Sequence, residues 1–480
     1  ETVSTDFDTS DRLYFDPLTL EHSAEILLRE KAHGILLQFG GQTAINLALP
    51  LAGRLPHLEG MGLNLAMQGT TPDAVDEASD RERFEAFAER VGLRMPNGAT
   101  ASTPEGVREA VQEIGYPVLI RPSYVLGGRG MEILSNKRQL DAYMEEAFLS
   151  PDRPLLVDEY LGNAIELDVD AVCDGSEVLI GAIMEHLEEA GIHSGDSTCF
   201  IPPQNVSKKV LAQVEDWTRK IGIQLGVKGC FNIQYAIRGE ILYVLEVNPR
   251  GSRTFPFVAK ATGVPLARIA ARLTMGEKLA DLDFPEPQSE AVCVKAPVFP
   301  FIKLRGLDPA PGPEMKSTGE VMGSHKRAAA AYLKARLATE IPVPTDGGVY
   351  ITVKNADKHD VIPLAQELEE MGFTIYATRG TAHVLRDSGG IDVQTCYRIA
   401  EGLTPDALDL MRQGKIQLII NTPRSTGGAV LDGNMMRRLA VELNIPFVTT
   451  MAGARMEVQA IAEAKEGMPE PRLLDIAILN

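Results

Sequence analysis

The C-terminal part of the chain alternates short apolar runs with longer stretches that fit helices. The apolar runs have the length of strands and cover residues 349–353, 374–378, 417–422 and 446–450. Helices are predicted between them, most clearly at 360–371 and 434–443. Strands that alternate with helices form a parallel sheet covered on both faces. We therefore predict a doubly wound parallel α/β domain at 348–480, preceded by a linker at 338–347.

The middle of the chain is richer in strand patterns. Residues 155–186 fit three strands, the last two joined by the hairpin signal Asp174-Gly175. A second hairpin is predicted at 229–250, turning near Gly239-Glu240. A proline-rich stretch begins near Asp281 but keeps a strand pattern, so we assign it to the same body. This part of the chain is predicted to be an α+β domain.

Helices are predicted before these strands. The pattern fits helices at 80–91 and 104–114, the second with Thr103 as N-cap and proline at its first position. Nearer the start, 34–39 fits a short strand, and a Gly-Gly turn leads to a helix at about 43–51. This βα unit can seat an anion on free backbone amides, but such a turn serves as often for simple chain reversal.

A carboxylate and an amide stand two residues apart at the end of the second hairpin. The sequence there is Leu-Glu-Val-Asn-Pro-Arg, from Leu245 to residue 250. Side chains at positions i and i+2 of a strand share a face. Glu246 and Asn248 are therefore predicted to point together, with Tyr243, Leu245 and Val247 on the opposite face.

Gln234 lies on the first strand of this hairpin, where it could face Glu246 across the ladder. Hard cations such as Mg²⁺ prefer oxygen ligands, few of them from protein, with phosphate oxygens completing the shell. One carboxylate and two amides suit that need. The alternative is that Glu246 is satisfied by Arg250 or Arg253, and the strand pattern alone leaves both interpretations open.

A glycine-rich loop at 122–130 follows a short apolar strand that ends in Arg121. Its three glycines leave backbone amides free to approach a polyphosphate, and Arg121 and Arg129 provide positive charge. An ordinary surface hairpin loop is the alternative. A polar loop at 191–197 contains His193, which we expect to be a hydrogen-bonding partner rather than a catalytic base.

Composition excludes several classes of protein. The 480 residues include 66 acidic and 47 basic side chains, and the net charge of −19 argues against a nucleic-acid binder. The five cysteines form no CxxC pair, which predicts a reducing, cytoplasmic location. No apolar run approaches the roughly 20 residues of a membrane span. The length predicts two to four domains.

Taken together, the arginine at a strand end, the glycine-rich loop, the polar loop and the hairpin with oxygen ligands resemble the ATP-grasp superfamily. Longer stretches resemble the carbamoyl phosphate synthetase large subunit in that family's order. They cover residues 1–15, 121–129, 185–197 and 312–323. The resemblance extends over essentially the whole chain and matches the second half of that subunit with its C-terminal regulatory domain.

This resemblance implies a division of the chain. The divisions are a partial Rossmann-like pre-ATP-grasp subdomain at 1–72, an ATP-grasp domain at 73–337, the linker, and a methylglyoxal-synthase-like domain at 348–480. It implies ATP-dependent phosphorylation of carbamate to carbamoyl phosphate, which feeds pyrimidine and arginine biosynthesis. The implied partners are the N-terminal half of the large subunit and a glutaminase small subunit. Because the family's opening strand and glycine-rich loop do not precede Glu1, we expect the chain to be a piece of a longer polypeptide.

The resemblance also implies roles for residues of the ATP-grasp domain. Phosphate contacts would be Arg81 and Arg121. Adenine and ribose would be held near Glu159, Leu161 and Glu166, with Gly191, Ile192, His193 and Ser194 lining the nucleotide pocket. Mg²⁺ or Mn²⁺ would be bound by Gln234, Glu246 and Asn248, and carbamate by Arg250 and Arg253. No catalytic base is implied, because carbamate is itself the nucleophile.

Threonines and an asparagine follow the strands of the C-terminal domain, where ligands bind in such sheets. The resemblance implies a nucleotide effector such as UMP or IMP, held by Lys358, Thr378, Thr381, Arg398, Asn421 and Thr422. Ala296 replaces an acidic residue of ornithine-responsive members, although Glu188 and Asp196 are retained, so we do not expect ornithine activation. The alternatives are another ATP-grasp carboxylate ligase, related to biotin carboxylase, and a nucleotide-binding regulatory module without catalysis.

Overall fold

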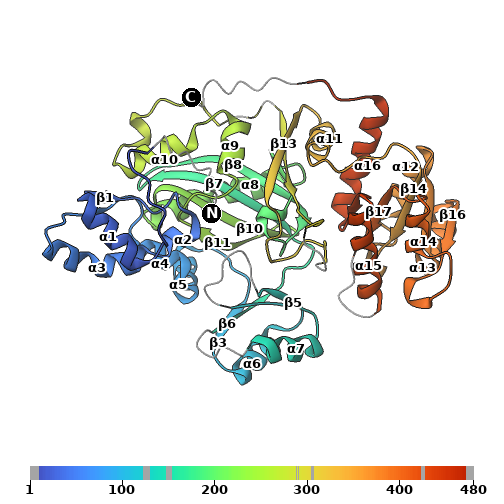
Figure 1. Ribbon diagram of the computed structural model, residues 1–480, viewed down its shortest axis with the longest axis horizontal. Helices are drawn as coiled ribbons and strands as arrows, with labels where there is room; N and C mark the ends of the chain where they lie inside the picture. The colour runs from blue at the N-terminus through green and yellow to red at the C-terminus, as the bar shows by residue number, and fades with distance from the viewer. Residues whose placement is uncertain are drawn as a thin grey trace.

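The computed structural model describes residues 10–122, 130–147, 154–287, 289, 291–303, 308–422 and 428–471. Gly127, Gly128 and Arg129 of the predicted phosphate loop lie outside the described residues, as does the start of the chain, whereas Gly130 is described. Figure 1 shows the N-terminal helices on one side of a large sheet, a smaller sheet below it and the C-terminal domain on the other side. Among the described helices, none combines the length and apolar character needed to cross a membrane.

The N-terminal subdomain is mainly helical. Its elements are α1 (Leu20–Glu30), β1 (Gly34–Ile35), α2 (Gly41–Ile45), α3 (Ala48–Gly60), β2 (Ala66–Met67), α4 (Pro72–Ser79) and α5 (Arg81–Val91). β1 and β2 form a parallel pair. The predicted strand 34–39 is therefore too long, since only its first residues pair. The predicted helix 43–51 is wrong at its end, because buried Leu51 and Leu58 continue the apolar stripe through α3.

A small antiparallel sheet carries the predicted phosphate loop. Its elements are β3 (Gly98–Ala101), α6 (Pro104–Ile114), β4 (Val118–Pro122), β5 (Glu132–Leu134), α7 (Lys137–Ala147) and β6 (Leu155–Glu159). The strand order is β3-β6-β4-β5. Helix α6 begins as predicted, since Thr103 Oγ1 accepts a hydrogen bond of 3.1 Å from the amide of Gly106.

The large sheet has seven antiparallel strands in the order β11-β10-β7-β8-β9-β12-β13. Its elements are β7 (Ile165–Asp174), β8 (Val178–Glu189), η1 (Ser194–Asp196), β9 (Cys199–Ile201), α8 (Lys208–Gln224), β10 (Lys228–Arg238), β11 (Ile241–Asn248), α9 (Phe255–Thr262), α10 (Leu266–Thr274), η2 (Leu279–Asp281), β12 (Val292–Val298), β13 (Gly319–His325) and α11 (Ala328–Ala338). Strands β12 and β13 confirm that the proline-rich stretch belongs to this body.

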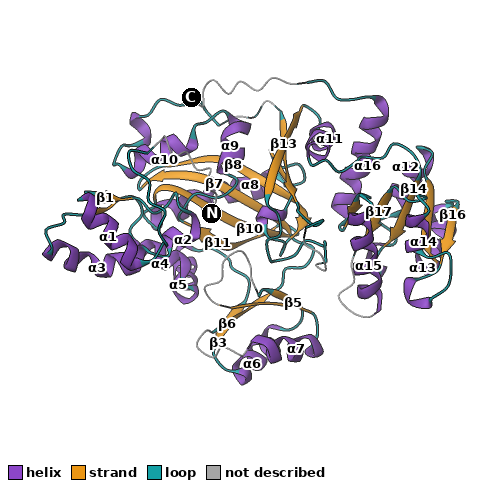
Figure 2. Cartoon of the chain, in the orientation of Figure 1, coloured by secondary structure: helices purple, strands orange, loops and turns teal. Residues whose placement is uncertain are grey.

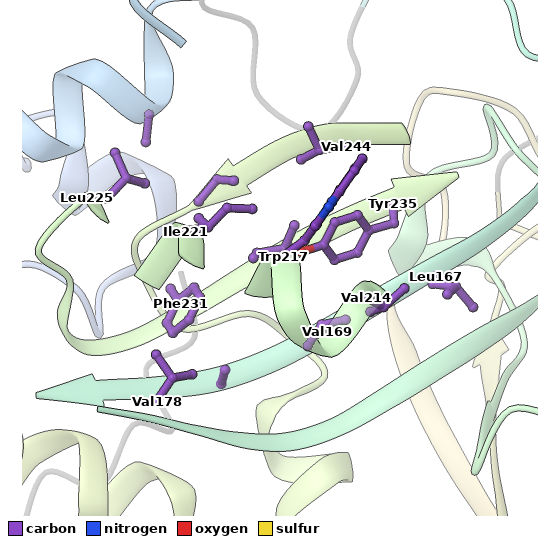
Figure 3. Close-up of a cluster of buried hydrophobic side chains, with 14 of the residues drawn as sticks. Leu167, Val169, Val178, Val214, Trp217, Ile221, Leu225, Phe231, Tyr235 and Val244 are labelled. Atoms are coloured by element: carbon purple, nitrogen blue, oxygen red, sulfur yellow. The ribbon is translucent and has the colours of Figure 1, made fainter. Parts of the chain in front are cut away.

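Helix α8 covers one face of this sheet (Figure 3). Val214, Trp217 and Ile221 of α8 pack against Phe231 and Tyr235 of β10. Burying each large side chain of this kind contributes about 1.5–3 kcal/mol to stability. Because side chains alternate along a strand, the polar residues of β7 and β10 lie on the face away from α8.

A β-bulge in β11 changes one predicted face. Gln234 pairs with Glu246 but its neighbour Tyr235 pairs with Val244, so Leu245 is an extra residue without a partner. Val247 packs in the core under α8, whereas Tyr243 and Leu245 join a separate apolar cluster with Leu161, Ala164, Ala190 and Ala236. The prediction that Tyr243, Leu245 and Val247 share a face is therefore wrong, because the bulge interrupts the alternation.

The C-terminal domain is a doubly wound parallel sheet, as predicted. Its strand order is β16-β15-β14-β17-β18, and every pairing is parallel. Its elements are β14 (Gly348–Thr352), η3 (Asn355–Asp357), α12 (Ile362–Glu370), β15 (Thr374–Thr378), α13 (Arg379–Gly389), β16 (Val393–Cys396), η4 (Ile399–Glu401), α14 (Ala407–Arg412), β17 (Leu418–Asn421), α15 (Gly428–Glu442), β18 (Phe447–Val448) and α16 (Met451–Glu466). Figure 2 shows helices on both sides of these strands.

The sequence did not predict strand β16 or helix α14. Only Val393 and Cys396 of β16 are buried, and the two residues between them are exposed. β16 is an edge strand with one partner, so its residues do not form an apolar run. This short, half-polar edge explains why the pattern missed it.

Candidate nucleotide and effector sites

Three oxygen-bearing side chains meet at the end of the β10–β11 hairpin. Gln234 of β10 lies opposite Glu246 of β11, as predicted. The Asn248 amide donates a 2.8 Å hydrogen bond to Glu246 Oε1, so these two side chains point together. The Gln234 amide donates to Ser194 Oγ over 3.1 Å, which ties the hairpin to the polar loop.

The structure shows which side chains surround Glu246. No ion pair within 4.0 Å joins it to Arg250 or Arg253 among the described residues. Arg250 instead donates from Nη2 to Asn248 Oδ1 over 3.2 Å and from Nε to Gln42 Oε1 over 2.8 Å. Arg253 is exposed. Arg250 is close enough for the Glu246 charge to act on its pKa, although the two form no ion pair within 4.0 Å. Glu246 is thus a half-buried carboxylate beside two amides, a donor set that suits Mg²⁺.

The polar loop is held in place by its own backbone and by a buried lysine. Burial lowers the pKa of His193, and its Nδ1 accepts a 3.0 Å hydrogen bond from the Gly195 amide. This is the ordering role expected for His193. Lys295, which is 1% exposed, donates to the carbonyl oxygen of Ser194 over 3.1 Å. The sequence did not single out Lys295, because one lysine in a strand gives no signal.

The residues predicted near adenine and ribose lie where the chain passes from β6 of the small sheet to β7 of the large sheet, and in the polar loop after β8. Leu161 is buried in the apolar cluster that contains Leu245. The amide of Gly191 donates to Glu166 Oε2 over 3.3 Å, and burial raises the pKa of Glu166 to about 7. The Glu159 carboxylate forms an ion pair of 2.7 Å with Arg238. Ile192 is half-buried beside Gly191 in the polar loop.

The two predicted phosphate arginines meet at an aspartate that the sequence did not single out. Arg81 Nη2 lies 2.9 Å from Asp158 Oδ1, and Arg121 Nε lies 3.6 Å from Asp158 Oδ2. Among the described residues, these two nitrogens and Asp158 Oδ1 are buried without an aligned hydrogen-bond partner. The Asp158 carboxylate therefore balances part of the positive charge of the two arginines, and the role of Arg81 and Arg121 as phosphate contacts stays a prediction.

All predicted effector residues line one cavity of about 290 Å³ in the C-terminal domain. They are Lys358, Thr378, Thr381, Arg398, Asn421 and Thr422. The cavity opens at the carboxyl ends of the strands, and helix α13 begins there without a side-chain cap. Free amides at a helix N-terminus together with cationic side chains favour a phosphate. Buried Arg437 also lines it and donates to Asn421 Oδ1 over 2.6 Å.

A second cavity of about 190 Å³ is lined by both the ATP-grasp body and the C-terminal domain, and it includes Glu188, Asp196 and Ala296. The two retained acids already have partners. Asp196 accepts from the amides of Lys316 and Ser317, at 2.8 and 2.9 Å. Glu188 accepts from the Thr198 amide over 2.6 Å, and burial raises its pKa. The expected lack of an ornithine response stays a prediction.

Three family models match successive parts of the chain. The carbamoyl phosphate synthase preATP-grasp domain matches residues 1–77, and the carbamoyl-phosphate synthase L chain, ATP binding domain matches 80–282. The MGS-like domain matches 360–449. The matches therefore follow one another in chain order.

Curated relatives and solved structures agree with these matches. The carbamoyl phosphate synthase large chain of Methanoculleus marisnigri is 48% identical over 97% of this chain, and that of Methanothermobacter thermautotrophicus is 48% identical over 99%. The chain spans 44% of the length of each. The biotin carboxylase domain of Hydrogenobacter thermophilus 2-oxoglutarate carboxylase, solved with MgADP, ADP and bicarbonate, has a similar fold, with a TM-score of 0.55 and 18% identity over 70% of this chain and 81% of that one. The chain belongs to the family of carbamoyl phosphate synthase large chains.

Proposed function

We propose that this chain phosphorylates carbamate to carbamoyl phosphate with ATP, as the second half of a large chain that serves pyrimidine and arginine biosynthesis. The observation that carries the proposal is the Glu246 carboxylate, in register with Gln234 and beside Asn248, with no ion pair to an arginine among the described residues. The family membership supports it. The same membership supports an N-terminal half and a glutaminase subunit as partners. None of the five cysteines, all of them described, forms a disulfide, which supports a cytoplasmic location.

In this proposal Gln234, Glu246 and Asn248 hold Mg²⁺ or Mn²⁺. The bound cation supplies positive charge that balances the phosphate oxygens of ATP. The protein groups do the rest by positioning. Arg250 presents the planar fork of donors that suits a carboxylate or phosphate, and its Nε is fixed by Gln42.

The proposed reaction is a direct transfer. A carbamate oxygen attacks the γ-phosphorus of ATP, a new O–P bond forms, and the bond from the γ-phosphorus to the bridging oxygen breaks as ADP leaves. The attacking oxygen already carries negative charge, so no base is required. The contribution expected of the protein is in-line alignment and charge neutralisation.

The C-terminal cavity is proposed to bind a nucleotide monophosphate effector, such as UMP or IMP. Its volume, its cationic side chains Lys358 and Arg398, and the open start of α13 support a phosphorylated ligand. The match to the MGS-like domain supports a regulatory role for this part of the chain.

The reverse half-reaction tests the proposal. Purified chain is supplied with Mg²⁺, ADP and carbamoyl phosphate, and ATP formation is measured beside Glu246→Ala and Glu240→Ala. Glu240 lies exposed at the turn of the same hairpin, so it is a matched control. We expect ATP formation by the wild type and Glu240→Ala, and its loss in Glu246→Ala. Full activity of Glu246→Ala would contradict the proposal.

A further inference from the structure

Asp170 is a buried carboxylate that the proposed mechanism does not use. It lies on β7, on the face away from α8, and is 0% exposed. It accepts hydrogen bonds from Ser252 Oγ at 2.7 Å, Thr254 Oγ1 at 2.7 Å and Asn232 Nδ2 at 2.9 Å. A carboxylate is costly to bury unless its oxygens are satisfied. These three donors are therefore what allows Asp170 to stay in the core.

Two of these donors flank Arg253. Ser252 and Thr254 stand on either side of it in the chain, and their hydroxyl oxygens lie 2.9 Å apart. One carboxylate thus fixes the backbone immediately before and after Arg253. The Arg253 side chain is exposed, while Thr254 is buried. The anchor and the arginine therefore lie on different sides of the loop.

The other end of this arginine loop, residues 249–254, is fixed by the N-terminal subdomain. Gln38 is 2% exposed, and its side-chain amide donates to the Pro249 carbonyl over 3.0 Å. The Gly251 amide donates to the Gln38 carbonyl over 2.9 Å. Gln38 therefore fixes the first part of the loop, at Pro249 and Gly251, and Asp170 fixes the second part through Ser252 and Thr254. Arg253 lies in this second part.

We propose that Asp170 is a positioning residue, which acts through Ser252 and Thr254 to aim Arg253 at the anionic substrate. The inference rests on the proposed function, in which Arg253 binds carbamate or its phosphorylated form. Among the described residues, no hydrogen bond or ion pair joins Asp170 to Gln234, Glu246, Asn248 or Arg253. Its negative charge does act on Arg250, where it opposes the lowering of the pKa by burial. A displacement of about 1 Å in a positioning group can cost on the order of 100-fold in rate, so a fixed loop matters for the transfer.

A pair of substitutions at Thr254 tests this role. Thr254→Val has nearly the same shape but lacks the hydroxyl, whereas Thr254→Ser keeps it. Each variant is titrated with carbamoyl phosphate and with ADP by calorimetry, and ATP formation is measured in parallel. We expect Thr254→Val to bind carbamoyl phosphate at least 10-fold more weakly with ADP affinity within twofold, and Thr254→Ser to stay within threefold of wild type for both. Asp170→Asn is also expected to weaken carbamoyl phosphate binding, but it removes a negative charge near Arg250 as well, so the Thr254 pair is the decisive comparison.

A double substitution separates positioning from general stability. If Thr254 acts through Arg253, then Thr254→Val has little further effect on carbamoyl phosphate affinity in an Arg253→Ala background. An equal loss in both backgrounds, or an equal loss for ADP and carbamoyl phosphate, would overturn the proposal. If Asp170→Asn does not fold, the Thr254 pair decides alone.

The binding readout separates this inference from the proposed function. Wild type that forms no ATP but binds carbamoyl phosphate through Thr254 and Arg253 would support the positioning role and contradict the proposed reaction. ATP formation that depends on Glu246 but not on Thr254 would do the reverse. Wild type without any affinity for carbamoyl phosphate would overturn both.

Discussion

Substitution of Glu457 is expected to destabilise the contact between the C-terminal domain and the ATP-grasp body strongly. Glu457 lies on α16 with 0% exposure, and its Oε2 accepts from Tyr332 Oη at 2.7 Å and Arg336 Nε at 3.2 Å. Both partners belong to α11, and the Arg336 side chain is 13% exposed. Glu457→Gln keeps the shape but leaves the Arg336 charge without its partner.

The magnitude follows from the burial of this pair. Removing one member of a buried ion pair costs about 3–5 kcal/mol, because the remaining charge stays buried. Glutamine still offers one oxygen as an acceptor, so we expect the lower end, about 3 kcal/mol. With a slope of about 3 kcal/mol per molar urea, the midpoint of unfolding falls by about 1 M.

Two spectroscopic probes show in which domain the midpoint of unfolding falls. Trp217 is the single tryptophan of the chain and packs from α8 against the large sheet, so its fluorescence reports the ATP-grasp body. Far-ultraviolet circular dichroism reports both domains. We expect Glu457→Gln to shift the dichroism transition of the C-terminal domain more than the fluorescence transition.

Glu463→Gln is the matched control on the same helix. Glu463 pairs with Arg327 over 2.5 Å, but the Arg327 side chain is 59% exposed. The Glu463 side chain is only 14% exposed, but water solvates the Arg327 charge when its partner is removed, so this pair is expected to contribute less than the buried one. The reasoning would be refuted if Glu463→Gln and Glu457→Gln shifted the midpoint equally, or if Glu457→Gln left it unchanged.

Two further predictions follow from the sites. Burial raises the pKa of Glu166 from 4.5 to about 7; His186 lowers this pKa, while Asp168 and Glu246 raise it further. The Glu166 carboxyl therefore binds a proton more tightly in the native state than in the unfolded state. Wild type should therefore lose stability relative to Glu166→Gln as the pH rises from 4.5 to 7, and urea midpoints that rise instead would contradict this. Asp308 accepts from Arg437 Nε at 2.9 Å and Nη2 at 2.6 Å, and Arg437 also lines the C-terminal cavity that is proposed to bind the effector. Asp308→Ala should reduce the fold-change in ADP affinity that UMP or IMP causes, measured by calorimetry, and an unchanged fold-change would speak against this link.

Local patterns in the sequence were enough to determine much of the fold. The Thr103 cap, the register of Gln234 with Glu246, and the alternating strands and helices after residue 348 depend on residues close together in the chain. Periods of two or 3.6 residues and capping side chains carry that information directly. The six predicted effector residues also share one cavity, because parallel strands end at the same edge of their sheet.

Only the tertiary structure decided which polar side chains meet. Arg250 and Gln42 are 208 residues apart in the chain, and Asp170 lies 82 and 84 residues from its hydroxyl donors. No local pattern in the sequence distinguishes these side chains from other polar residues. A buried polar group must find partners wherever the fold places them, and those partners are fixed by sheet order and by the bulge at Leu245. The sequence therefore predicted most strands and helices, while tertiary packing determined which polar side chains contact one another around Arg250 and the 249–254 loop.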